Sequence, residues 1–213
     1  MGASLSERWN RYYAAAGDDP RETLLAALGR FEAEPANRER LAVDLGCGTG
    51  RDTKELLRRG WRVLAIDAQE EAIERLREQD DVLAAQDRLE TSVADFESAT
   101  LPANDLVNAS FSLPFCPPES FAWLWQQVVS SLRPGGRFCG QLFGDRDEWA
   151  SRPLTSSDAW SSPLAMTFHT RTELDELLRD LEIEQLVEID EDGKTAVGDD
   201  KHWHLFHVVA RKR

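Results

Sequence analysis

Short apolar runs alternate along the chain with amphipathic stretches of helical period. Most of the runs are followed by a segment whose apolar positions recur every three or four residues. Continuous apolar runs of this length are typical of parallel strands that are covered on both faces. Such strands are predicted at residues 41–45, 63–66, 89–93, 106–109 and 138–143.

The most clearly predicted helix lies between two proline-containing turns. Pro117 and Pro118 provide a start signal, and Pro134 with Gly135 provides a stop signal. Between them the apolar residues fall on one stripe, which is typical of a helix that packs against a sheet. The stripe consists of Phe121, Leu124, Trp125, Val128, Val129 and Leu132.

The C-terminal part departs from this alternation. Thr170 and Glu173 fit a capping box at the start of a helix. Two β-rich segments follow, residues 183–189 and 205–210, joined by an acidic loop without a helix. Strands joined in this way form a hairpin, so the last strand is expected to run antiparallel. The pattern predicts a doubly wound α/β fold with a seven-stranded, mostly parallel sheet and helices on both faces.

Two segments lie outside the strand and helix alternation. We expect residues 1–40 to form a helical N-terminal cap. Residues 144–169 are expected to form a lid loop on the substrate side, because loops of this length are usually functional or disordered. The 213 residues are expected to form a single domain, residues 1–213.

The charge balance excludes some classes of partner. The chain has 25 Lys and Arg residues against 39 Asp and Glu residues, and its net charge of -14 repels nucleic-acid phosphates and anionic lipid surfaces. No apolar run approaches the ~18 residues of a membrane span. Three widely separated cysteines favour reduced thiols. We therefore expect a cytoplasmic protein that binds neither nucleic acid nor membranes.

A glycine-rich loop follows the first predicted strand, in the sequence Asp44-Leu-Gly46-Cys-Gly48-Thr-Gly50. Glycines at this position allow a sharp turn and a close approach of a ligand to the main chain. The next helix adds free N–H groups at its N-terminus. In a doubly wound sheet, the ligand site lies at the carboxyl ends of the central strands, where this loop is expected.

Three details distinguish this loop from other nucleotide sites. Arg51 stands where a dinucleotide fingerprint requires its third small residue, and no Gly-Lys-Ser/Thr follows to make a phosphate loop. Asp44 places an acid beside the loop, which suits an ammonium or sulfonium better than a pyrophosphate. Asp67 ends the second strand, where a carboxylate can accept hydrogen bonds from both ribose hydroxyls.

These motifs resemble those of the class I S-adenosylmethionine-dependent methyltransferases. The resemblance covers residues 41–143 through the motifs at 44–50, 65–67 and 93–96, and the reversed last strand agrees with it. It implies a Rossmann-like methyltransferase domain that uses S-adenosylmethionine as its cofactor. The residues that the resemblance places at the cofactor are Asp44, Gly46, Cys47, Gly48, Gly50, Asp67, Ala68, Asp95, Phe96 and Ala109.

The resemblance also implies a role for each part of this cofactor site. The backbone of residues 46–50 would line the amino-acid part of the cofactor, and Asp67 would hold its ribose. Asp95 and Phe96 would face the adenine, although a simple turn is the competing interpretation. Ala109 would lie near the methionine end.

The resemblance favours a small methyl acceptor. Residues 105–115 lack the Asp/Asn-Pro-Pro-Tyr/Phe signature of amino-directed nucleic-acid and protein methylases. Residues 51–63 and 9–13 are loosely similar to the tellurite-resistance and thiopurine type enzymes. We therefore expect transfer of a methyl group to a small molecule by in-line displacement, with the protein a monomer or a homodimer. The acceptor and its nucleophilic atom are not identified by the sequence.

Several residues are candidates for the acceptor side of the site. His169 is a weak candidate for a catalytic base, and a capping or rim residue is the alternative. Tyr13, with Trp9 and Tyr12, could close over the cofactor, since aromatic faces stabilise a cation. Candidate substrate-binding residues follow the fourth and fifth strands: Phe111, Phe115, Arg146 and Trp149.

Three histidines near the C-terminus suggest a metal site but do not fit one. His202 and His204 share a strand face, whereas His207 has the opposite parity. A regular strand cannot direct all three at one ion, so we expect no metal. Two alternatives to a methyltransferase remain open: a non-catalytic protein that binds S-adenosylmethionine, and a nicotinamide oxidoreductase, which Asp44 and Arg51 disfavour.

Overall fold

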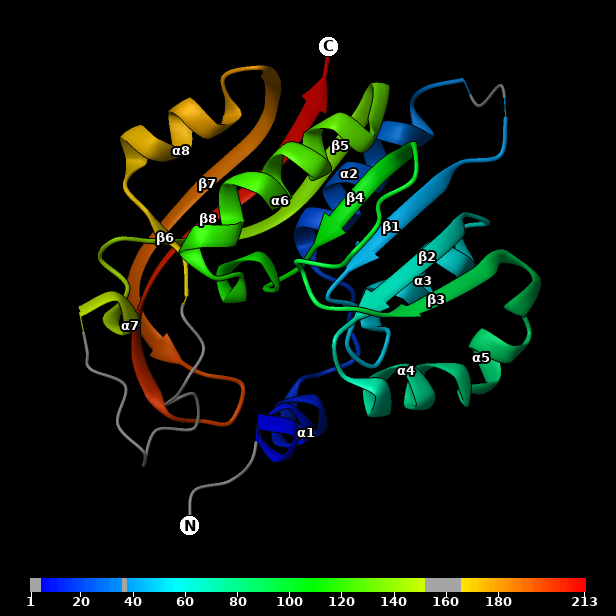
Figure 1. The fold of residues 1–213 in the computed structure, drawn as a ribbon, viewed down its shortest axis with the longest axis horizontal. Helices are drawn as coiled ribbons and strands as arrows, with labels where there is room; N and C mark the ends of the chain where they lie inside the picture. Colours follow the sequence, from blue (N-terminus) through cyan, green and yellow to red (C-terminus); the bar gives the residue numbers. More distant parts are fainter. Residues whose placement is uncertain (1–4, 36–37, 152–165) are drawn as a thin grey trace.

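The computed structural model describes residues 5–35, 38–151 and 166–213. These residues form one mixed sheet in the order β3-β2-β1-β4-β5-β8-β7, and the short β6 pairs with β5 (Figure 1). The strands are β1 Leu41–Leu45, β2 Arg62–Asp67, β3 Leu89–Val93, β4 Asn104–Ala109, β5 Leu132–Gly144, β6 Phe168–His169, β7 Leu181–Lys194 and β8 Asp200–Lys212.

The strand directions confirm the predicted doubly wound sheet. Strands β3, β2, β1, β4 and β5 run parallel, and β8 runs antiparallel to both β5 and β7. The eighth strand, β6, was not predicted. It joins β5 only through Phe168 and His169, and a strand of two residues is too short to produce a periodic signal.

Helices cover both faces of the sheet, as predicted. Neighbouring strand residues point to opposite faces: Ala42 belongs to the core beneath α2, α3 and α4, and Val43 to the core beneath α6 and α8. The helices are α1 Leu5–Ala15, α2 Glu22–Glu32, α3 Arg51–Arg58, α4 Glu70–Arg77, α5 Asp80–Leu83, α6 Pro118–Ser131, α7 Glu148–Ser151 and α8 Arg171–Leu178, with 3-10 turns at Gln86–Arg88 and Leu113–Phe115.

The predicted helix signals are present at α6 and α8. Helix α6 begins at Pro118 and buries four residues of its apolar stripe, Phe121, Leu124, Trp125 and Val128. At α8, the Thr170 hydroxyl accepts from the backbone of Glu173, whose carboxylate accepts in return. Strand β5 begins earlier than predicted, because Leu132 already pairs with Asn104 before the register shifts.

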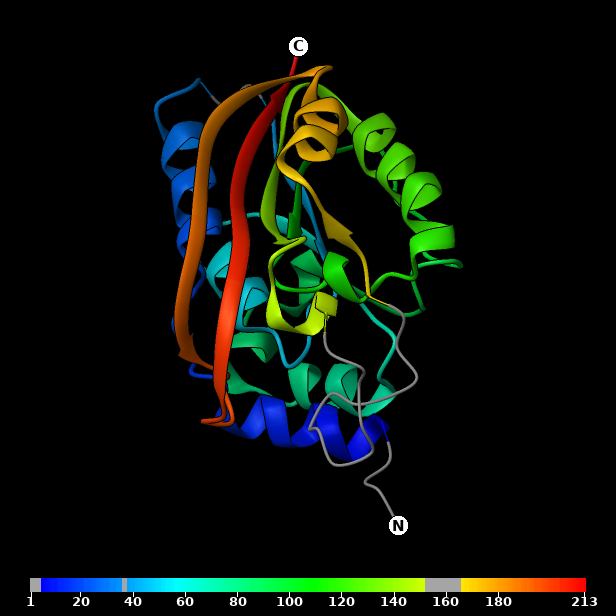
Figure 2. The same cartoon turned by 90° about the vertical axis from the view of Figure 1, so that its left-hand side faces the viewer.

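The β7–β8 hairpin forms one side of the molecule (Figure 2). Its strands are 14 and 13 residues long, and β7 lies at the edge of the sheet. No helix among the described residues is long and apolar enough to cross a membrane. The acidic residues of β7 are Glu182, Glu184, Glu188, Asp190, Glu191 and Asp192.

Candidate functional site

A pocket of about 320 Å³ lies at the carboxyl ends of β1, β2 and β4. Helix α1 and the segment that follows it, as far as Arg21, form the opposite wall. Helix α1 is fastened to α4 by a hydrogen bond of 2.7 Å from the Asn10 amide to Glu71 (Figure 1). The position agrees with the site expected for a doubly wound sheet.

The glycine loop forms the floor of this pocket. Gly46 and Gly48 have φ angles of 75° and 54°, in the left-handed region that favours glycine. A Cβ at residue 46 would lie 2.3 Å from the Cβ of Ser112, so no larger residue fits without movement. The backbone N–H groups of Gly46 and Cys47 both donate to the carbonyl of Ile66, which fixes the loop against β2.

Asp44 is a buried carboxylate at the end of β1. It accepts hydrogen bonds from the hydroxyl of Thr53 at 2.5 Å and from the amide of Asn108 at 2.9 Å. The same amide also donates to Asp52 at 3.0 Å. Burial, with the nearby charge of Asp52, raises the pKa of Asp44 to about 7. The site thus holds a carboxylate whose ionisation would be favoured by a cationic ligand group.

Asp67 ends β2 and faces the same pocket. Its carboxylate accepts from the backbone N–H of Gly48 at 2.8 Å and from that of Gln69 at 2.9 Å. Burial raises its pKa, while these hydrogen bonds favour the charged form. Asp67 therefore shapes the glycine loop and presents an acceptor to the pocket.

Aromatic residues of α1 cover the glycine loop. A Cβ on Gly48 would lie 2.8 Å from the ring of Tyr13, which shows how closely this side chain approaches. Burial and the charge of Asp67 raise the pKa of Tyr13, so it stays neutral. Trp9 stacks on Tyr13 at 6.0 Å and meets the edge of Phe115 at 5.1 Å between ring centroids.

Phe111, just after β4, has a strained backbone. Its φ angle is 53°, which bulky residues rarely adopt. The backbone N–H of Phe111 donates to the buried side chain of Gln141 at 3.0 Å, and Gln141 donates to Thr23 of α2 at 2.9 Å. The guanidinium of Arg21 lies over the Phe111 ring, 4.6 Å from its centroid. The fold thus holds this ring at the pocket wall.

Most of the predicted cofactor residues line this one pocket. Gly50 and Ala109 do not line it: Gly50 packs against Leu76, and Ala109 is buried in the core. Those that line it are Asp44, Gly46, Cys47, Gly48, Asp67, Ala68, Asp95 and Phe96, together with Tyr13 and the two predicted acceptor residues Phe111 and Phe115.

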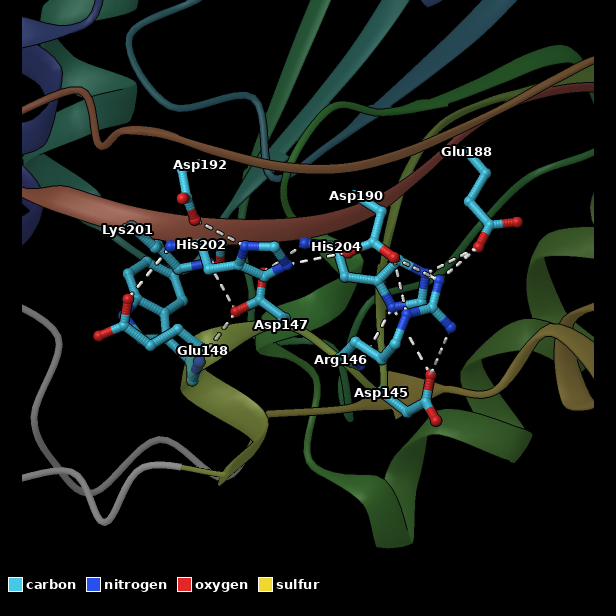
Figure 3. A network of polar contacts seen from close by, with 11 residues as sticks. Asp145, Arg146, Asp147, Glu148, Glu188, Asp190, Asp192, Lys201, His202 and His204 are labelled. Atoms are coloured by element: carbon cyan, nitrogen blue, oxygen red, sulfur yellow. Dashed lines mark hydrogen bonds and ion pairs between the residues drawn. The ribbon is translucent and has the colours of Figure 1, made fainter.

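The other three acceptor-side candidates are not in the pocket lining. The ring of His169 is buried against Phe121, with centroids 4.8 Å apart, and burial lowers its pKa. The Arg146 side chain binds the acids Glu188 and Asp190 of β7, as Figure 3 shows. Trp149 packs on Phe143. The middle of the predicted lid, residues 152–165, lies outside the described residues.

The three C-terminal histidines do not converge: His202 and His204 contact acids of β7, and His207 lies elsewhere. His202 bridges Asp190 and Asp192 at 2.8 Å each, and His204 contacts Glu188 (Figure 3). His207 lies against Phe111 instead. Within the described residues, no group of His, Cys, Asp and Glu side chains is arranged to hold a metal ion.

Sequence reasoning missed several pocket residues. Arg21 and Asp52 line the pocket and were not selected; nor was Asn108, which lies outside the lining and donates to Asp44. Arg51 also lines the pocket and was noted only as a mismatch to another fingerprint. Arg51 could have been found, because it directly follows the glycine loop at the start of α3. Arg21 has no such local signal, since the long-range packing of α2 brings it to Phe111.

Comparisons with known proteins agree with this geometry. A family described as a methyltransferase domain matches residues 42–136. The carboxy-S-adenosyl-L-methionine synthase of Aeromonas hydrophila is 30% identical over 117 residues, which make up 53% of this chain and 47% of that protein. The chain therefore spans about half the length of the curated relatives that it matches.

Two solved structures share the fold. TehB from Haemophilus influenzae superposes with a TM-score of 0.68 at 18% identity, over 88% of this chain and 62% of that one. The 1,6-didemethyltoxoflavin-N1-methyltransferase of Burkholderia thailandensis, solved with 1,6-didemethyltoxoflavin and S-adenosylhomocysteine, gives 0.64 at 22% identity, over 90% and 77% of the two chains. Both likenesses show the Rossmann-like architecture.

Proposed function

We propose that the protein is a class I S-adenosylmethionine-dependent methyltransferase that methylates a small molecule, since residues 42–136 match a family described as a methyltransferase domain. The observation that carries the proposal is the pair of acids beside the glycine loop. Asp44 is the last residue but one of β1, Asp67 ends the neighbouring β2, and both line the pocket. Asp44 suits the cationic ammonium and sulfonium groups of S-adenosylmethionine, and Asp67 suits its ribose hydroxyls.

The pocket residues divide along the cofactor. The backbone of Gly46 to Thr49 would lie against the amino-acid part, and Asp44 would face its ammonium. Asp67 would accept from the ribose hydroxyls. Asp95 and Phe96 would flank the adenine, and Tyr13 covers the glycine loop from α1. Gly50 and Ala109 support this arrangement from behind, through packing rather than direct contact.

The chain's contribution to the reaction is alignment and exclusion of water. When bound, S-adenosylmethionine supplies an activated methyl group for in-line displacement. Orientation alone can lower such a barrier by about 7–11 kcal/mol. The aromatic residues Trp9, Phe111 and Phe115 enclose the acceptor side of the pocket. We infer a cytoplasmic enzyme, a monomer or a homodimer, and no observation favours a non-catalytic role.

Calorimetry with the purified protein tests the proposed cofactor. S-adenosylhomocysteine is expected to bind, NAD is not, and Asp67→Ala should weaken binding by about 1–3 kcal/mol because it leaves buried hydrogen-bonding groups unpaired. Asp87→Ala, at an exposed acid outside the pocket, is the matched control. S-adenosylhomocysteine should also accumulate from S-adenosylmethionine in a metabolite extract. Absence of binding would overturn the proposal, and binding without turnover would favour the non-catalytic alternative.

Arg51 is expected to bind the carboxylate of the cofactor. It lies at the first position of α3, directly after the glycine loop, and lines the pocket. Burial and the positive charge of Arg21 lower its pKa. The charges of Asp52 and Asp18 act on it in the opposite sense, but within the described part of the chain Asp18 pairs with Lys54, and Asp52 accepts from the Arg21 backbone and the Asn108 amide. A carboxylate ligand would therefore relieve an unfavourable charge.

Arg51→Gln should weaken S-adenosylhomocysteine binding by about tenfold, the effect of losing about 1.4 kcal/mol. Binding of 5′-methylthioadenosine, which lacks the amino-acid part, should not change. Titration of both ligands into the variant and the parent protein checks the difference. Equal losses for the two ligands would show that Arg51 acts on the loop rather than on the carboxylate.

A further inference from the structure

The pocket is larger than the part assigned to the cofactor. Its remaining wall comes from α1, from the turn after it and from the segment that follows β4. Aromatic side chains form much of this wall. Arg21 is the arginine of this wall, whereas Arg51 directly follows the glycine loop. The aromatic residues, the cation and the proline of this wall are Trp9, Tyr12, Arg21, Phe111, Phe115 and Pro117, and its acid, Asp18, pairs with Lys54 at 3.1 Å.

The two phenylalanines present rings that the fold holds in place. The Phe111 backbone sits in a conformation that costs of order 1–3 kcal/mol, and such strain persists only where the surroundings enforce it. Here the buried Gln141 enforces it. The ring of Phe115 is fixed between Trp9 and Phe143, at 5.1 and 6.0 Å. A rigid aromatic wall of this kind suits a flat aromatic ligand, through stacked or edge contacts.

Arg21 favours a ligand that carries a negative charge. Its guanidinium is placed over Phe111 and donates to the hydroxyl of Tyr12 at 3.3 Å. No carboxylate pairs with this guanidinium among the described residues, although its backbone N–H donates to Asp52. Arg21 is thus one of two arginines, with Arg51, that line the pocket without an ion pair to the described residues. Its planar fork matches a carboxylate in a bidentate geometry.

The cofactor does not account for this second cation. It brings one carboxylate, which Arg51 is placed to bind beside the glycine loop. Arg21 lies over Phe111 instead, beyond the end of β4 and close enough to affect the pKa of His207 of β8. The neighbouring positive charges of Arg21 and Arg51 repel each other, and a second anion would relieve this repulsion.

We propose that the methyl acceptor is a flat aromatic carboxylate, whose ring lies against Phe111 and Phe115 and whose carboxylate pairs with Arg21. This inference rests on the proposed function, since it assigns the acceptor half of the same pocket. The ring contacts set the plane of the acceptor. The ion pair sets its direction, so that its nucleophilic atom faces the methionine end of the cofactor.

The test uses the full chain saturated with S-adenosylhomocysteine and three probes. Calorimetry or tryptophan fluorescence measures the binding of 2-naphthoate, of its neutral amide 2-naphthamide, and of the non-aromatic cyclohexanecarboxylate. We expect 2-naphthoate to bind about tenfold or more tightly than either comparator. Arg21→Gln should abolish the preference for the carboxylate over the amide. Arg11→Gln, at an exposed arginine of α1 outside the pocket lining, should keep it.

The outcomes separate this inference from the proposed function. If S-adenosylhomocysteine does not bind, the proposed function fails and the inference fails with it. If it binds but 2-naphthoate shows no preference over its comparators, only the inference is overturned, and this measurement needs no variant. If Arg21→Gln weakens binding of S-adenosylhomocysteine but not of 5′-methylthioadenosine, then Arg21 serves the carboxylate of the cofactor, and the inference is again overturned.

Discussion

Replacing Asp44 with asparagine is expected to weaken S-adenosylhomocysteine binding by roughly 10- to 150-fold while making the ligand-free protein more stable at neutral pH. The loss corresponds to about 1.5–3 kcal/mol, the contribution of a hydrogen bond to a charged group. Asparagine fits the site, since its oxygen can still accept from Asn108 and its amide can donate to the Thr53 hydroxyl. Only the charge that faces the ammonium of the cofactor is removed.

The gain in stability follows from the direction of the pKa shift. Burial and Asp52 raise the pKa of Asp44 to about 7 in the folded protein, well above its value in the unfolded chain. The stabilising contribution of the protonated acid is thus complete below about pH 4, and it is lost as the pH rises toward 7. Asparagine mimics the protonated acid at every pH, so this loss should disappear from the variant.

Thermal unfolding of the ligand-free protein at pH 5 and pH 8 measures this effect. The parent protein should lose more stability between these pH values than Asp44→Asn. Asp105→Asn is the matched control: burial raises the pKa of Asp105, but hydrogen bonds from Arg38 and the Leu41 backbone outweigh it and lower the pKa. That variant should be destabilised at both pH values. An Asp44→Asn protein that binds S-adenosylhomocysteine normally would remove Asp44 from the site.

Lys201→Met is expected to destabilise the fold by about 3–5 kcal/mol, the usual effect of breaking a buried ion pair. The ammonium of Lys201 pairs with Asp147 at 2.5 Å, and both side chains are almost fully buried. Three aromatic rings lie near the ammonium: its nitrogen is 3.6 Å from the ring centroid of Trp203, 4.2 Å from that of Trp149 and 5.5 Å from that of Phe143. Without Lys201, the carboxylate of Asp147 is left buried and uncompensated.

The double variant Lys201→Met/Asp147→Leu provides the control. It removes both charges and keeps apolar volume, so it should recover most of the stability that the single variant loses. Urea denaturation of the parent protein, the single variant and the double variant gives the three free energies of unfolding. A double variant as unstable as Lys201→Met would show that the hydrogen bonds that Asp147 accepts from the backbone N–H groups of Trp149 and His204 dominate instead of the charge pairing.

The glycine loop and its two acids could be predicted because their signal is local. Asp44 precedes the loop in sequence, and Asp67 ends the next strand. The remaining pocket residues depend on contacts between distant segments. Gln141 holds Phe111 through a hydrogen bond and reaches Thr23, which lies 118 positions away in sequence. Neither periodicity nor motif spacing indicates a contact between segments so far apart, because the contact depends on how α2 packs on the sheet.

The position of Arg146 and the length of the β7–β8 hairpin also depend on contacts between distant segments. A residue after a strand end was expected to face substrate, but acids of β7 attract the Arg146 guanidinium to the hairpin. Glu188 lies near the end of the predicted strand 183–189, and Asp190 lies just beyond it. There β7 and β8 continue through polar pairs such as Asp192 and His202, which an apolar pattern cannot reveal.

The edge position of β7 has a consequence for the behaviour of the protein in solution. Strand β7 pairs with β8 on one side only, so the other edge of this strand of 14 residues is a template on which aggregates can grow, and Ile183 and Val187 are exposed along it. Its six carboxylates would face those of a second β7 at neutral pH and repel them. The acidic character of this strand thus protects against precipitation, and acidified solutions are where the protein would first lose solubility.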